Sequence, residues 1–461
     1  MSGLRIVVCV KEVQGDLNPF DACALECGLR LSEDVTVVSM GRPSAENILL
    51  RLTRLGCKAI LMTDKAFAGA DTLATAYALS AMMKRLNPDL ILCGRQSIDG
   101  DTAQTGPALA TMLGIPFASN AMALEQNGDA LSVETRMGSV TLPFPSLVTV
   151  ERINNLRFPK LTSRLGEVQK IDAAALGVDP ARCGLTGSPT RVMRTFESAV
   201  GRRKCQYITK EEMFRLVKEK AGERRSSFAE MESQQKLPLV WCVGEEVVPA
   251  AKRIAENIVT IERNDPHAIA KRLIEEKPDF VLWPADLWGR SAAPVVQVLL
   301  NTGLCADCTA LETDGSDLFM YRPAFSGTLT AKIRCTTKPV MATVRIADHN
   351  SDDLIVGLGK GAIEAKDKIE GFLTAFGGQR AASRGVVDAG LAPYEEQVGL
   401  TGRTIGSSVY VAVGISGAVH HTCALDRVGT VIAVNPDKNA RIFEYADYGV
   451  VAKAEEVFAD Y

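Results

Sequence analysis

The stretch Val409-Tyr-Val-Ala-Val-Gly-Ile-Ser-Gly-Ala418 decides the fold of the C-terminal part of this 461-residue chain. Its first five residues form an unbroken apolar run rich in β-branched side chains, which predicts a strand buried on both faces of a parallel sheet. Gly414 and Gly417 then bracket Ser416, so the backbone there can approach a ligand closely. A helix beginning at Ala418 would direct its free N–H groups at an anion. The stretch therefore predicts a phosphate-binding turn, although the glycine spacing alone is equally consistent with a structural turn.

Composition and charge exclude several classes of protein. The chain is 46% hydrophobic and 23% charged, as expected for a soluble globular protein. Its net charge of -3 argues against nucleic acid as the main partner. No stretch is long and apolar enough for membrane insertion, and the short apolar run near the N-terminus predicts a first strand rather than a signal sequence. We therefore predict a cytoplasmic protein.

The 12 cysteines fit a reducing compartment, where cysteines act as small buried hydrophobic side chains. Two pairs allow a metal interpretation. However, Cys305 and Cys308 have no second pair at zinc-finger spacing, and Cys23 and Cys27 have no histidine nearby in the sequence. We therefore predict no metal site.

The N-terminal part alternates predicted strands and helices. Strands are expected at residues 5–10, 35–40 and 90–93, because each is a short apolar run. Helices are expected after Asn18-Pro19 and over residues 71–86. This β-α-β-α-β order predicts a largely parallel sheet.

The third of these strands runs into Gly94-Arg-Gln-Ser-Ile-Asp-Gly-Asp-Thr-Ala-Gln-Thr-Gly-Pro107. Small and hydroxyl residues that follow the carboxyl end of a strand and open a helix are typical of nucleotide sites in α/β sheets. A solvated loop with an Asp N-cap is the alternative interpretation.

The second half of the chain repeats this pattern. Pro278-Asp-Phe-Val-Leu resembles Pro88-Asp-Leu-Ile-Leu, and Met341-Ala-Thr-Val-Arg resembles Leu147-Val-Thr-Val-Glu. The two copies span residues 89–152 and 279–345, which indicates an internal repeat of one α/β unit. The second copy lacks the Asp-Gly-Asp-Thr cluster, so we interpret it as a scaffold.

Two charged segments are predicted to be solvated. Residues 210–236 are rich in Lys, Glu and Arg, which predicts a solvated helical arm followed by a polar linker. The run Arg202-Arg203-Lys204 likewise predicts a solvated face. By contrast, Trp283 and Trp288 are predicted to serve in packing rather than as electron relays.

Four further motifs accompany the opening stretch in order: Ala382–Gly390, Gln397–Gly402, Val434–Asp437 and Tyr445–Gly449. Together with it they resemble the flavin domain of the α subunit of electron-transfer flavoproteins. The resemblance implies bound FAD, with Arg384, Thr401 and His421 at its redox-active ring. The residue types agree, since arginine is a permanent cation and threonine offers a hydroxyl to a ring nitrogen. The FAD-binding residues implied in this way are Ser383, Arg384, Gln397, Thr401, Gly402, Gly414, Ser416, Gly417, Ala418, His421, Asn435, Asp447 and Lys360.

Residues 1–200 resemble the β subunit of the same family. The loop Asp99-Gly-Asp-Thr-Ala-Gln-Thr-Gly-Pro107 has the form found in the flavin-bifurcating branch, whose members hold a second FAD there. Most other members hold AMP instead. The second nucleotide site implied by this resemblance consists of Cys9, Val10, Ser39, Met40, Asp99, Asp101, Thr102, Ala103, Gln104, Thr105 and Gly106.

Three departures from the family pattern limit this transfer. The segment Gln14-Gly-Asp-Leu17 is shorter than the usual loop, which lies on the NADH-using side of bifurcating members. The use of NADH is therefore open. Leu400 replaces a usual glutamine. Lys360 stands where the family has arginine, and lysine keeps the charge but lacks the bidentate fork.

The sequence therefore predicts an α/β fold with two repeated parallel-sheet nucleotide-binding-like domains and a smaller C-terminal α/β FAD domain. The expected divisions are a first domain over residues 1–205, an arm over 206–236, a second domain over 237–350 and the FAD domain over 351–461.

The resemblance implies a redox electron carrier in which a β subunit is fused to an α subunit. Such a carrier passes single electrons through FAD between a partner dehydrogenase and another carrier. Flavin bifurcation with two FAD and NADH is the favoured form, and a shuttle with one FAD and one AMP is the alternative. The implied partners are an acyl-CoA dehydrogenase-like or other flavin or iron–sulfur oxidoreductase, with ferredoxin or flavodoxin as candidate acceptors. A nucleotide-binding sensor or structural module is the alternative of another class.

Overall fold

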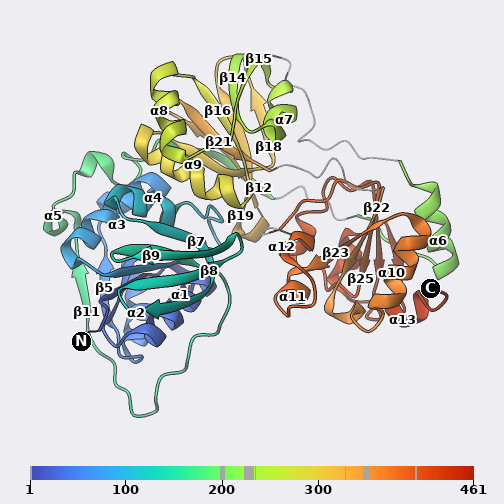
Figure 1. Cartoon of the computed structure of the whole chain (residues 1–461), viewed down its shortest axis with the longest axis horizontal. Helices are drawn as coiled ribbons and strands as arrows, with labels where there is room; N and C mark the ends of the chain where they lie inside the picture. The colour runs from blue at the N-terminus through green and yellow to red at the C-terminus, as the bar shows by residue number, and fades with distance from the viewer. Residues whose placement is uncertain are drawn as a thin grey trace. The chain divides into compact units, whose positions relative to one another are not determined.

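The computed structural model describes residues 3–197, 203–222, 233, 235–327, 329–345, 353–399 and 402–461 (Figure 1). Two compact units make up the chain. The first contains Met1–Arg194, Ser233–Phe325 and Ala331–Val344, and the second contains Thr195–Glu232, Ser326–Thr330 and Arg345–Tyr461. The first unit thus combines most of the two domains predicted before residue 351.

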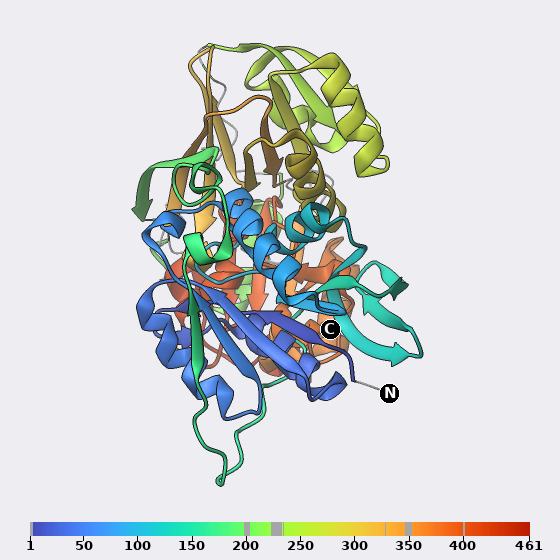
Figure 2. The same ribbon diagram turned by 90° about the vertical axis from the view of Figure 1, so that its left-hand side faces the viewer.

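The first unit contains a nine-stranded sheet in the order β11-β5-β4-β1-β6-β10-β7-β8-β9 (Figure 2). Neighbours from β11 to β7 are parallel, and β7, β8 and β9 form an antiparallel extension. The strands are β1 (Ile6–Cys9), β4 (Val35–Met40), β5 (Lys58–Met62), β6 (Leu90–Gly94), β7 (Phe117–Asn127), β8 (Ala130–Thr135), β9 (Gly138–Pro143), β10 (Ser146–Val150) and β11 (Val168–Ile171).

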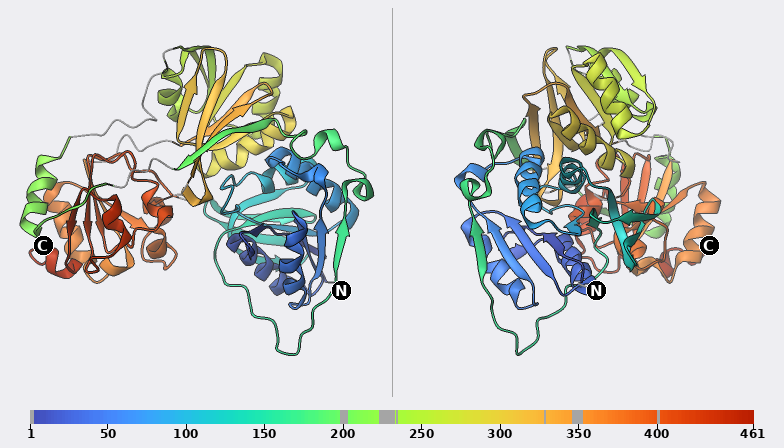
Figure 3. Two further views of the ribbon diagram at one scale, coloured as in Figure 1. Left: turned by 180° about the vertical axis from the view of Figure 1, so that it is seen from behind. Right: turned by 60° about the vertical axis from the view of Figure 1, so that its left-hand side comes forward.

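Helices cover both faces of this sheet, as Figure 3 lets the reader follow. α1 (Pro19–Leu31) and α2 (Glu46–Thr53) pack on one face. α3 (Thr72–Leu86), α4 (Thr105–Leu113) and α5 (Ala173–Leu176) pack on the other. Asp71 caps α3 by accepting the backbone N–H groups of Leu73 and Ala74. The predicted strands and helices are all present, but the predicted β-α-β-α-β order missed α2 and β5, which lie between the second predicted strand and the second predicted helix.

A five-stranded parallel sheet forms the second repeat, in the order β15-β14-β16-β21-β17. This order is equivalent to β4-β1-β6-β10-β7 in the first sheet, so the topology confirms the predicted internal repeat. The strands are β14 (Leu237–Val243), β15 (Ala255–Ile261), β16 (Phe280–Pro284), β17 (Leu304–Cys308) and β21 (Val340–Val344), and the helices are α7 (Val248–Lys252), α8 (Pro266–Glu276) and α9 (Leu287–Leu300).

The repeat extends to local detail. Asn120 in β7 and Asp307 in β17 both have positive φ, at 62° and 58°, where the register with the neighbouring strand shifts. Their backbone N–H groups donate to the hydroxyls of Thr149 and Thr343, at 2.9 and 2.8 Å. The same bulge is therefore stabilised in the same way in both copies.

A smaller four-stranded sheet has the order β12-β20-β19-β18. Its strands are β12 (Thr190–Glu197), β18 (Ala310–Thr313), β19 (Leu318–Ala324) and β20 (Leu329–Cys335), and β18 pairs with β19 in antiparallel fashion.

The second unit is built on a seven-stranded parallel sheet in the order β13-β27-β26-β25-β22-β23-β24. The opening stretch of the sequence forms its central strand β25 (Val409–Val413), which is buried along its whole length as predicted. The other strands are β13 (Gln206–Tyr207), β22 (Leu354–Leu358), β23 (Gln379–Ser383), β24 (Gln397–Val398), β26 (Thr430–Val434) and β27 (Tyr448–Val450), and the helices are α6 (Lys210–Glu219), α10 (Lys366–Phe376), α11 (Arg384–Val387), α12 (Val419–Thr422) and α13 (Ala454–Val457).

The prediction of a solvated arm over residues 210–236 is wrong for helix α6. Met213, Leu216 and Val217 are buried in the core of the second unit, and the Phe214 ring lies 5.5 Å from that of Phe372. The three buried positions share one helical face, so the charged residues between them concealed an amphipathic pattern. The linker over residues 223–232 lies outside the described residues.

Candidate functional site

The carboxyl edge of the C-terminal sheet gathers most of the predicted FAD residues. From β22 the chain proceeds to β23 and β24 on one side, and then crosses to β25, β26 and β27 on the other. Parallel α/β sheets bind ligands at such a switch point, outside the carboxyl ends of the strands. Here the switch point lies between the ends of β22 and β25, where Lys360 and the Gly414 turn follow their strands.

Backbone packing at this switch point requires glycine. A Cβ on Gly414, whose φ is +64°, would lie 2.5 Å from the carbonyl carbon of Gly361. A Cβ on Gly359 would lie 2.0 Å from the Gly414 carbonyl oxygen, and one on Gly417 (φ +86°) would lie 2.1 Å from the nitrogen of Ile442. Because these positions carry no side chain, the backbone itself forms the surface of the turn.

The turn leads into a short helix, as the start predicted at Ala418 required. Ala418 is the N-cap of α12, which ends at Thr422. Ser416 and Ala418 are exposed, as is Lys360 after β22. A four-residue helix has little dipole, so any anion bound here would depend mainly on the backbone N–H groups of the turn and on the lysine charge.

Ser383 and Arg384 lie where β23 ends and α11 begins. The Arg384 guanidinium forms an ion pair with Asp388, with Nε and Oδ2 3.1 Å apart. The predicted ring cation is therefore partly neutralised by its own helix, which the i,i+4 spacing of the two residues could have indicated.

Three further predicted FAD residues, Gln397, Thr401 and Gly402, lie in β24 or follow it in the sequence. Gln397 is buried in this strand, and its carbonyl oxygen accepts the backbone N–H of Arg403 at 2.8 Å. Gly402 donates its N–H to the carbonyl of Gly399 at 3.0 Å. Thr401 and Leu400 lie outside the described residues, so the predicted ring contact of Thr401 stays a prediction.

His421 is buried behind the glycine turn. Its Nε2 lies 2.9 Å from the hydroxyl of Tyr410 in β25. Burial lowers the pKa of His421 to about 4, against a smaller opposing effect of the Val398 backbone. The ring is therefore neutral at physiological pH, and besides Tyr410 it has the Val398 backbone as a hydrogen-bonding neighbour.

Asn435 and Asp447 are engaged by the protein itself. The Asn435 amide donates to the carbonyl of Ile415 at 3.0 Å, which braces the glycine turn. The Asp447 carboxylate accepts the backbone N–H of Val431 at 2.8 Å and pairs with Arg203. The predicted role of these two residues in binding FAD stays a prediction.

Arg203 is a residue whose role the sequence did not reveal. Its side chain is only 7% exposed and also donates to the carbonyl groups of Val428 and Gly429, at 2.8 and 3.1 Å. The prediction of a solvated charge run is therefore wrong at this position. The Arg203 guanidinium therefore links the segment before β13 to the residues that precede β26 and β27.

A second switch point lies at the carboxyl edge of the first sheet. From β1 the chain proceeds to β4 and β5, and then crosses to β6 on the other side of β1. The predicted second-nucleotide residues Cys9, Val10, Ser39 and Met40 lie at the ends of β1 and β4, on this edge. The structure therefore brings them to the same edge as the loop that follows β6.

Side-chain contacts hold the loop after β6 in a defined shape. The Asp99 carboxylate pairs with Lys11 at 2.7 Å, and buried Asp101 accepts a hydrogen bond from Gln96 at 3.0 Å. Asp101 and Ala103 have positive φ, at 51° and 56°, which is strained for residues with a side chain.

The loop leads directly into α4 through the remaining predicted residues. The Gln104 side chain accepts a hydrogen bond from the Thr72 hydroxyl at 2.8 Å. Thr102 and Thr105 are half-buried. Gly106 lies so close to β10 that a Cβ there would be 2.3 Å from Cγ2 of Thr149.

The first turn of α1 braces this second edge, a feature that the sequence reasoning missed. Asp21 accepts the backbone N–H groups of Lys11 and Gly94, at 2.8 and 3.2 Å, and so joins the ends of β1 and β6. Asn18 donates to the carbonyl of Gln96 at 2.9 Å. Burial raises the pKa of Asp21 to about 7. Asn18 and Asp21, two polar residues at the start of a predicted helix, were the sequence features that could have indicated this contact.

The equivalent edge of the second repeat is occupied by paired charges. Arg263 pairs with Glu246 and, at 2.7 Å, with Asp286. Only residues 285 and 286 separate β16 from α9, whereas residues 95–104 separate β6 from α4. These contacts agree with the interpretation of the second copy as a scaffold. Trp283 and Trp288 pack together there, with ring centroids 6.0 Å apart.

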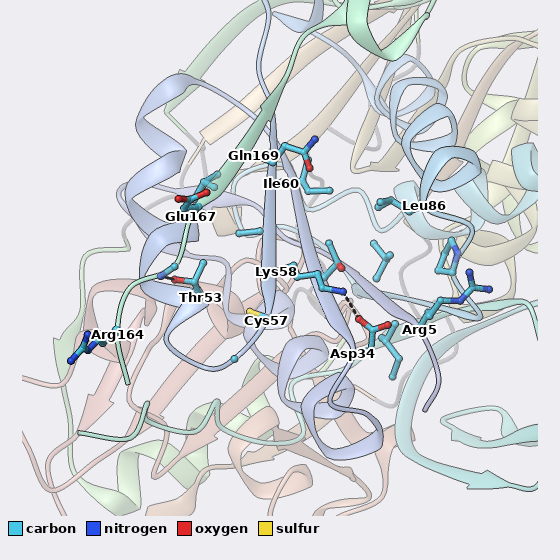
Figure 4. Close-up of a pocket in the computed structure, with 18 residues that line it drawn as sticks. Arg5, Asp34, Thr53, Cys57, Lys58, Ile60, Leu86, Arg164, Glu167 and Gln169 are labelled. Atoms are coloured by element: carbon cyan, nitrogen blue, oxygen red, sulfur yellow. Dashed lines mark hydrogen bonds and ion pairs between the residues drawn. The ribbon is translucent and has the colours of Figure 1, made fainter. Parts of the chain in front are cut away.

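An open cleft of about 810 Å³ lies at the opposite, amino edge of the first sheet (Figure 4). Lys58 and Asp34, which line it, form an ion pair with each other at 2.8 Å. None of the predicted nucleotide residues lines it. The cleft is therefore separate from both carboxyl edges.

The described residues offer no sign of a metal site or a membrane span. Within the ranges given above, no group of three or more His, Cys, Asp or Glu side chains is arranged to hold a metal ion. Cys305 and Cys308 lie buried in β17, and burial raises the pKa of Cys308. No helix among all the residues that the structure describes is long and apolar enough to cross a membrane.

These features define an α/β protein of the doubly wound class, with one candidate dinucleotide-binding edge in each unit. Residues 6–176 and 264–363 match the electron transfer flavoprotein domain, and residues 348–426 match the electron transfer flavoprotein FAD-binding domain. The chain therefore belongs to the electron transfer flavoprotein family.

Relatives of both subunit types are similar to parts of the chain. The electron transfer flavoprotein subunit beta of Megasphaera elsdenii is 37% identical over 42% of this chain and 87% of its own length. Subunit alpha of Thermoanaerobacterium thermosaccharolyticum is 36% identical over 40% of this chain and 70% of its own length. Protein FixA of Azorhizobium caulinodans is 35% identical over 44% and 88%. The chain thus fuses β-like and α-like parts, as the motifs predicted.

Proposed function

We propose that FAD binds at the carboxyl edge of β22, β23 and β25, and that the protein passes single electrons between a partner dehydrogenase and another redox carrier. The observation that carries this proposal is the close-packed glycine turn of Gly359, Gly414 and Gly417 at the switch point, where a Cβ at any of the three would overlap neighbouring backbone atoms and where the backbone is therefore the surface offered to a ligand. Bound FAD would supply the one-electron chemistry. The protein's contribution is to bind and orient it and to set the charge around it.

Each part of this edge has a distinct role in the proposal. The turn around Ser416 would bind the pyrophosphate through its backbone N–H groups, with Lys360 adding a positive charge. Arg384 would hold positive charge beside the ring, reduced by its ion pair with Asp388. His421 would meet the ring as a neutral group, because its pKa is about 4.

We further propose a second FAD at the edge of β1 and β6, and electron bifurcation from NADH. The strained backbone at Asp101 and Ala103 supports a ligand role for this loop, because such strain is typical of functional sites. The contrast with the second repeat also supports it, since the equivalent edge there is filled by the ion pairs of Arg263. The partner class is an acyl-CoA dehydrogenase-like or other flavin or iron–sulfur oxidoreductase, with ferredoxin or flavodoxin as an acceptor.

One observation favours the alternative of a plain shuttle with AMP in the second site. Strands β2 (Glu12–Val13) and β3 (Asp16–Leu17) form a minimal hairpin closed by Gln14 and Gly15, both at positive φ. The segment has no spare length for a nicotinamide-binding loop. A sensor without redox turnover gains no support from the described contacts.

The discriminating experiment counts nucleotides in the purified protein and then titrates it anaerobically with NADH. Two FAD per chain with bleaching by NADH supports bifurcation. One FAD and one AMP without a response to NADH contradicts it. Two FAD without a response would mean that another protein supplies the electrons.

A pair of variants at Ala103 assigns the second nucleotide to its loop. Ala103→Val places a β-branched residue at φ +56° and should release one nucleotide per chain, whereas Ala103→Gly relieves the strain and should retain it. Equal retention by the two variants would contradict the assignment.

A further inference from the structure

Cys9 and Cys93 lie side by side at the carboxyl edge of the first sheet. They are partners in the parallel register of β1 and β6, and both belong to the face of the sheet that α3 and α4 cover. Neighbouring strands lie about 4.8 Å apart, and the Cα atoms of disulfide-bonded cysteines are about 4.4–6.8 Å apart. The backbone therefore already has a spacing that a disulfide can bridge.

The two thiols differ in their access to solvent. Cys9 is partly exposed, whereas Cys93 is buried. The two side chains interact, and this interaction, followed by burial, raises the pKa of Cys93. Cys93 therefore stays protonated beside Cys9, and a solute that approaches the strand ends meets the Cys9 sulfur first. This asymmetry is typical of a reactive thiol with a neighbouring thiol that can resolve it.

Asp21 holds the two strand ends together directly beyond the cysteines. Its carboxylate accepts the backbone N–H groups of Lys11 and Gly94, at 2.8 and 3.2 Å. A Cβ on Gly94 would lie 2.3 Å from Oδ1 of Asp21, so the carboxylate fits closely against the end of β6. The protein itself thus keeps the two sulfurs adjacent.

The second repeat carries a different residue at this place. Trp283 in β16 stands at the position of Cys93, since Phe280-Val-Leu-Trp is equivalent to Leu90-Ile-Leu-Cys. That repeat has neighbouring thiols of its own, Cys305 and Cys308 in β17, but both are buried. An accessible thiol pair therefore accompanies the copy with the candidate nucleotide edge, and a tryptophan replaces one of its members in the scaffold copy.

We propose that Cys9 and Cys93 form a reversible disulfide that weakens nucleotide binding at the edge of β1 and β6. The inference rests on the proposed nucleotide site there. With hydrogen peroxide as the oxidant, the Cys9 sulfur attacks one oxygen, the O–O bond breaks, and Cys9 sulfenic acid and one water form. The Cys93 sulfur then displaces the hydroxyl group of the sulfenic acid, so that an S–S bond and a second water form. Two electrons pass from sulfur to oxygen, and each thiol proton completes one water.

The bond would change the nucleotide edge itself. An S–S bond is about 2.05 Å long, far shorter than a non-bonded contact between two sulfurs, so oxidation must draw the ends of β1 and β6 together. Cys9 and Val10 are among the predicted nucleotide residues, and the loop that contains Asp99 follows β6. Oxidation and nucleotide binding are therefore coupled, and the coupling acts equally in both directions.

Peptide mapping of the full-length protein tests the bond. The protein is reduced with dithiothreitol, freed of it, treated with stoichiometric hydrogen peroxide, alkylated and digested for mass spectrometry. We expect a Cys9–Cys93 cross-link that dithiothreitol reverses, while Cys305 and Cys308 stay reduced as the matched control. In Cys93→Ser, Cys9 should instead accumulate as sulfenic acid, which dimedone traps. A cross-link between other cysteines as the main product, or wild-type Cys9 oxidised without a cross-link, would overturn the proposal.

The reduced and oxidised proteins are then compared for nucleotide binding, with FAD and AMP as separate probes. Oxidation should release the second nucleotide and weaken its rebinding about tenfold, whereas Ala103→Val should release none on oxidation. Saturating nucleotide should then make the reduction potential of the disulfide about 30 mV more positive, the equivalent of tenfold for a two-electron couple. Equal affinity in the two states would contradict the proposal. Failure of the proposed function would look different, because the cross-link would form while the reduced protein bound neither FAD nor AMP at this edge.

Discussion

Replacing Asp21 by asparagine should change how the stability of the first unit depends on pH. Burial raises the pKa of this carboxyl from 3.8 to about 7 in the folded protein. One pKa unit corresponds to about 1.36 kcal/mol, so the shift represents up to about 4 kcal/mol of stability. A raised pKa in the folded state means that this stability is fully present below the unfolded pKa and is lost as the pH rises through about 7.

Urea denaturation at several pH values measures this effect. Between about pH 5 and about pH 8.5, the wild-type protein should lose about 3 kcal/mol of unfolding free energy relative to Asp21→Asn, which cannot ionise. Tryptophan fluorescence reports on the correct unit, because Trp241, Trp283 and Trp288 all belong to the first unit. Asp34→Asn, at a half-exposed surface ion pair, is the matched control.

The same variant should loosen the second nucleotide. An asparagine oxygen can accept one of the two N–H groups of Lys11 and Gly94, but its amide group opposes the other. The second site should therefore lose nucleotide while FAD at the C-terminal edge is retained. The reasoning is refuted if wild-type and Asp21→Asn stabilities change in parallel with pH, or if the wild type gains relative stability as the pH rises.

Three further changes test the C-terminal edge. Gly417→Ala places a side chain at φ +86°, so the protein should lose its FAD but keep the second nucleotide; flavin release on purification measures this. Arg203→Met leaves Asp447 without its cation and should destabilise the second unit by about 2–3 kcal/mol. Faster amide exchange in β27 measures this loss, and unchanged exchange would contradict the stabilising role of Arg203. Arg384→Ala should lower the first one-electron potential of the flavin by at most about 0.2 V and Asp388→Asn should raise it; shifts of the same sign would exclude the electrostatic role.

The sequence was most informative where a pattern is local and periodic. The unbroken apolar run of β25 and the helix over residues 71–86 were predicted with nearly the observed bounds, because both depend on periodic patterns in neighbouring residues. The internal repeat was also readable, since one unit occurs twice. Helix α6 was misread because charged residues outnumber the three that face the core.

Contacts between distant residues could not be read in the same way. Arg203 and Asp447 are 244 positions apart, and nothing near either residue indicates the other. The brace from Asp21 to Gly94 and the pair of Tyr410 with His421 likewise depend on how strands and helices are placed. Their shifted pKa values follow from burial, which composition alone does not give.

By itself, the sequence determined the α/β class, the fused β-like and α-like parts, the repeat and the glycine turn, because each is encoded in residues close together along the chain. The tertiary structure decided which of these residues meet. It placed the two candidate edges at switch points. It filled the carboxyl edge of the second repeat with the ion pairs of Arg263, and it paired Arg384 with Asp388. The physical reason is that strand order and burial arise from packing across the whole sheet, and they set the charge and protonation state of each side chain.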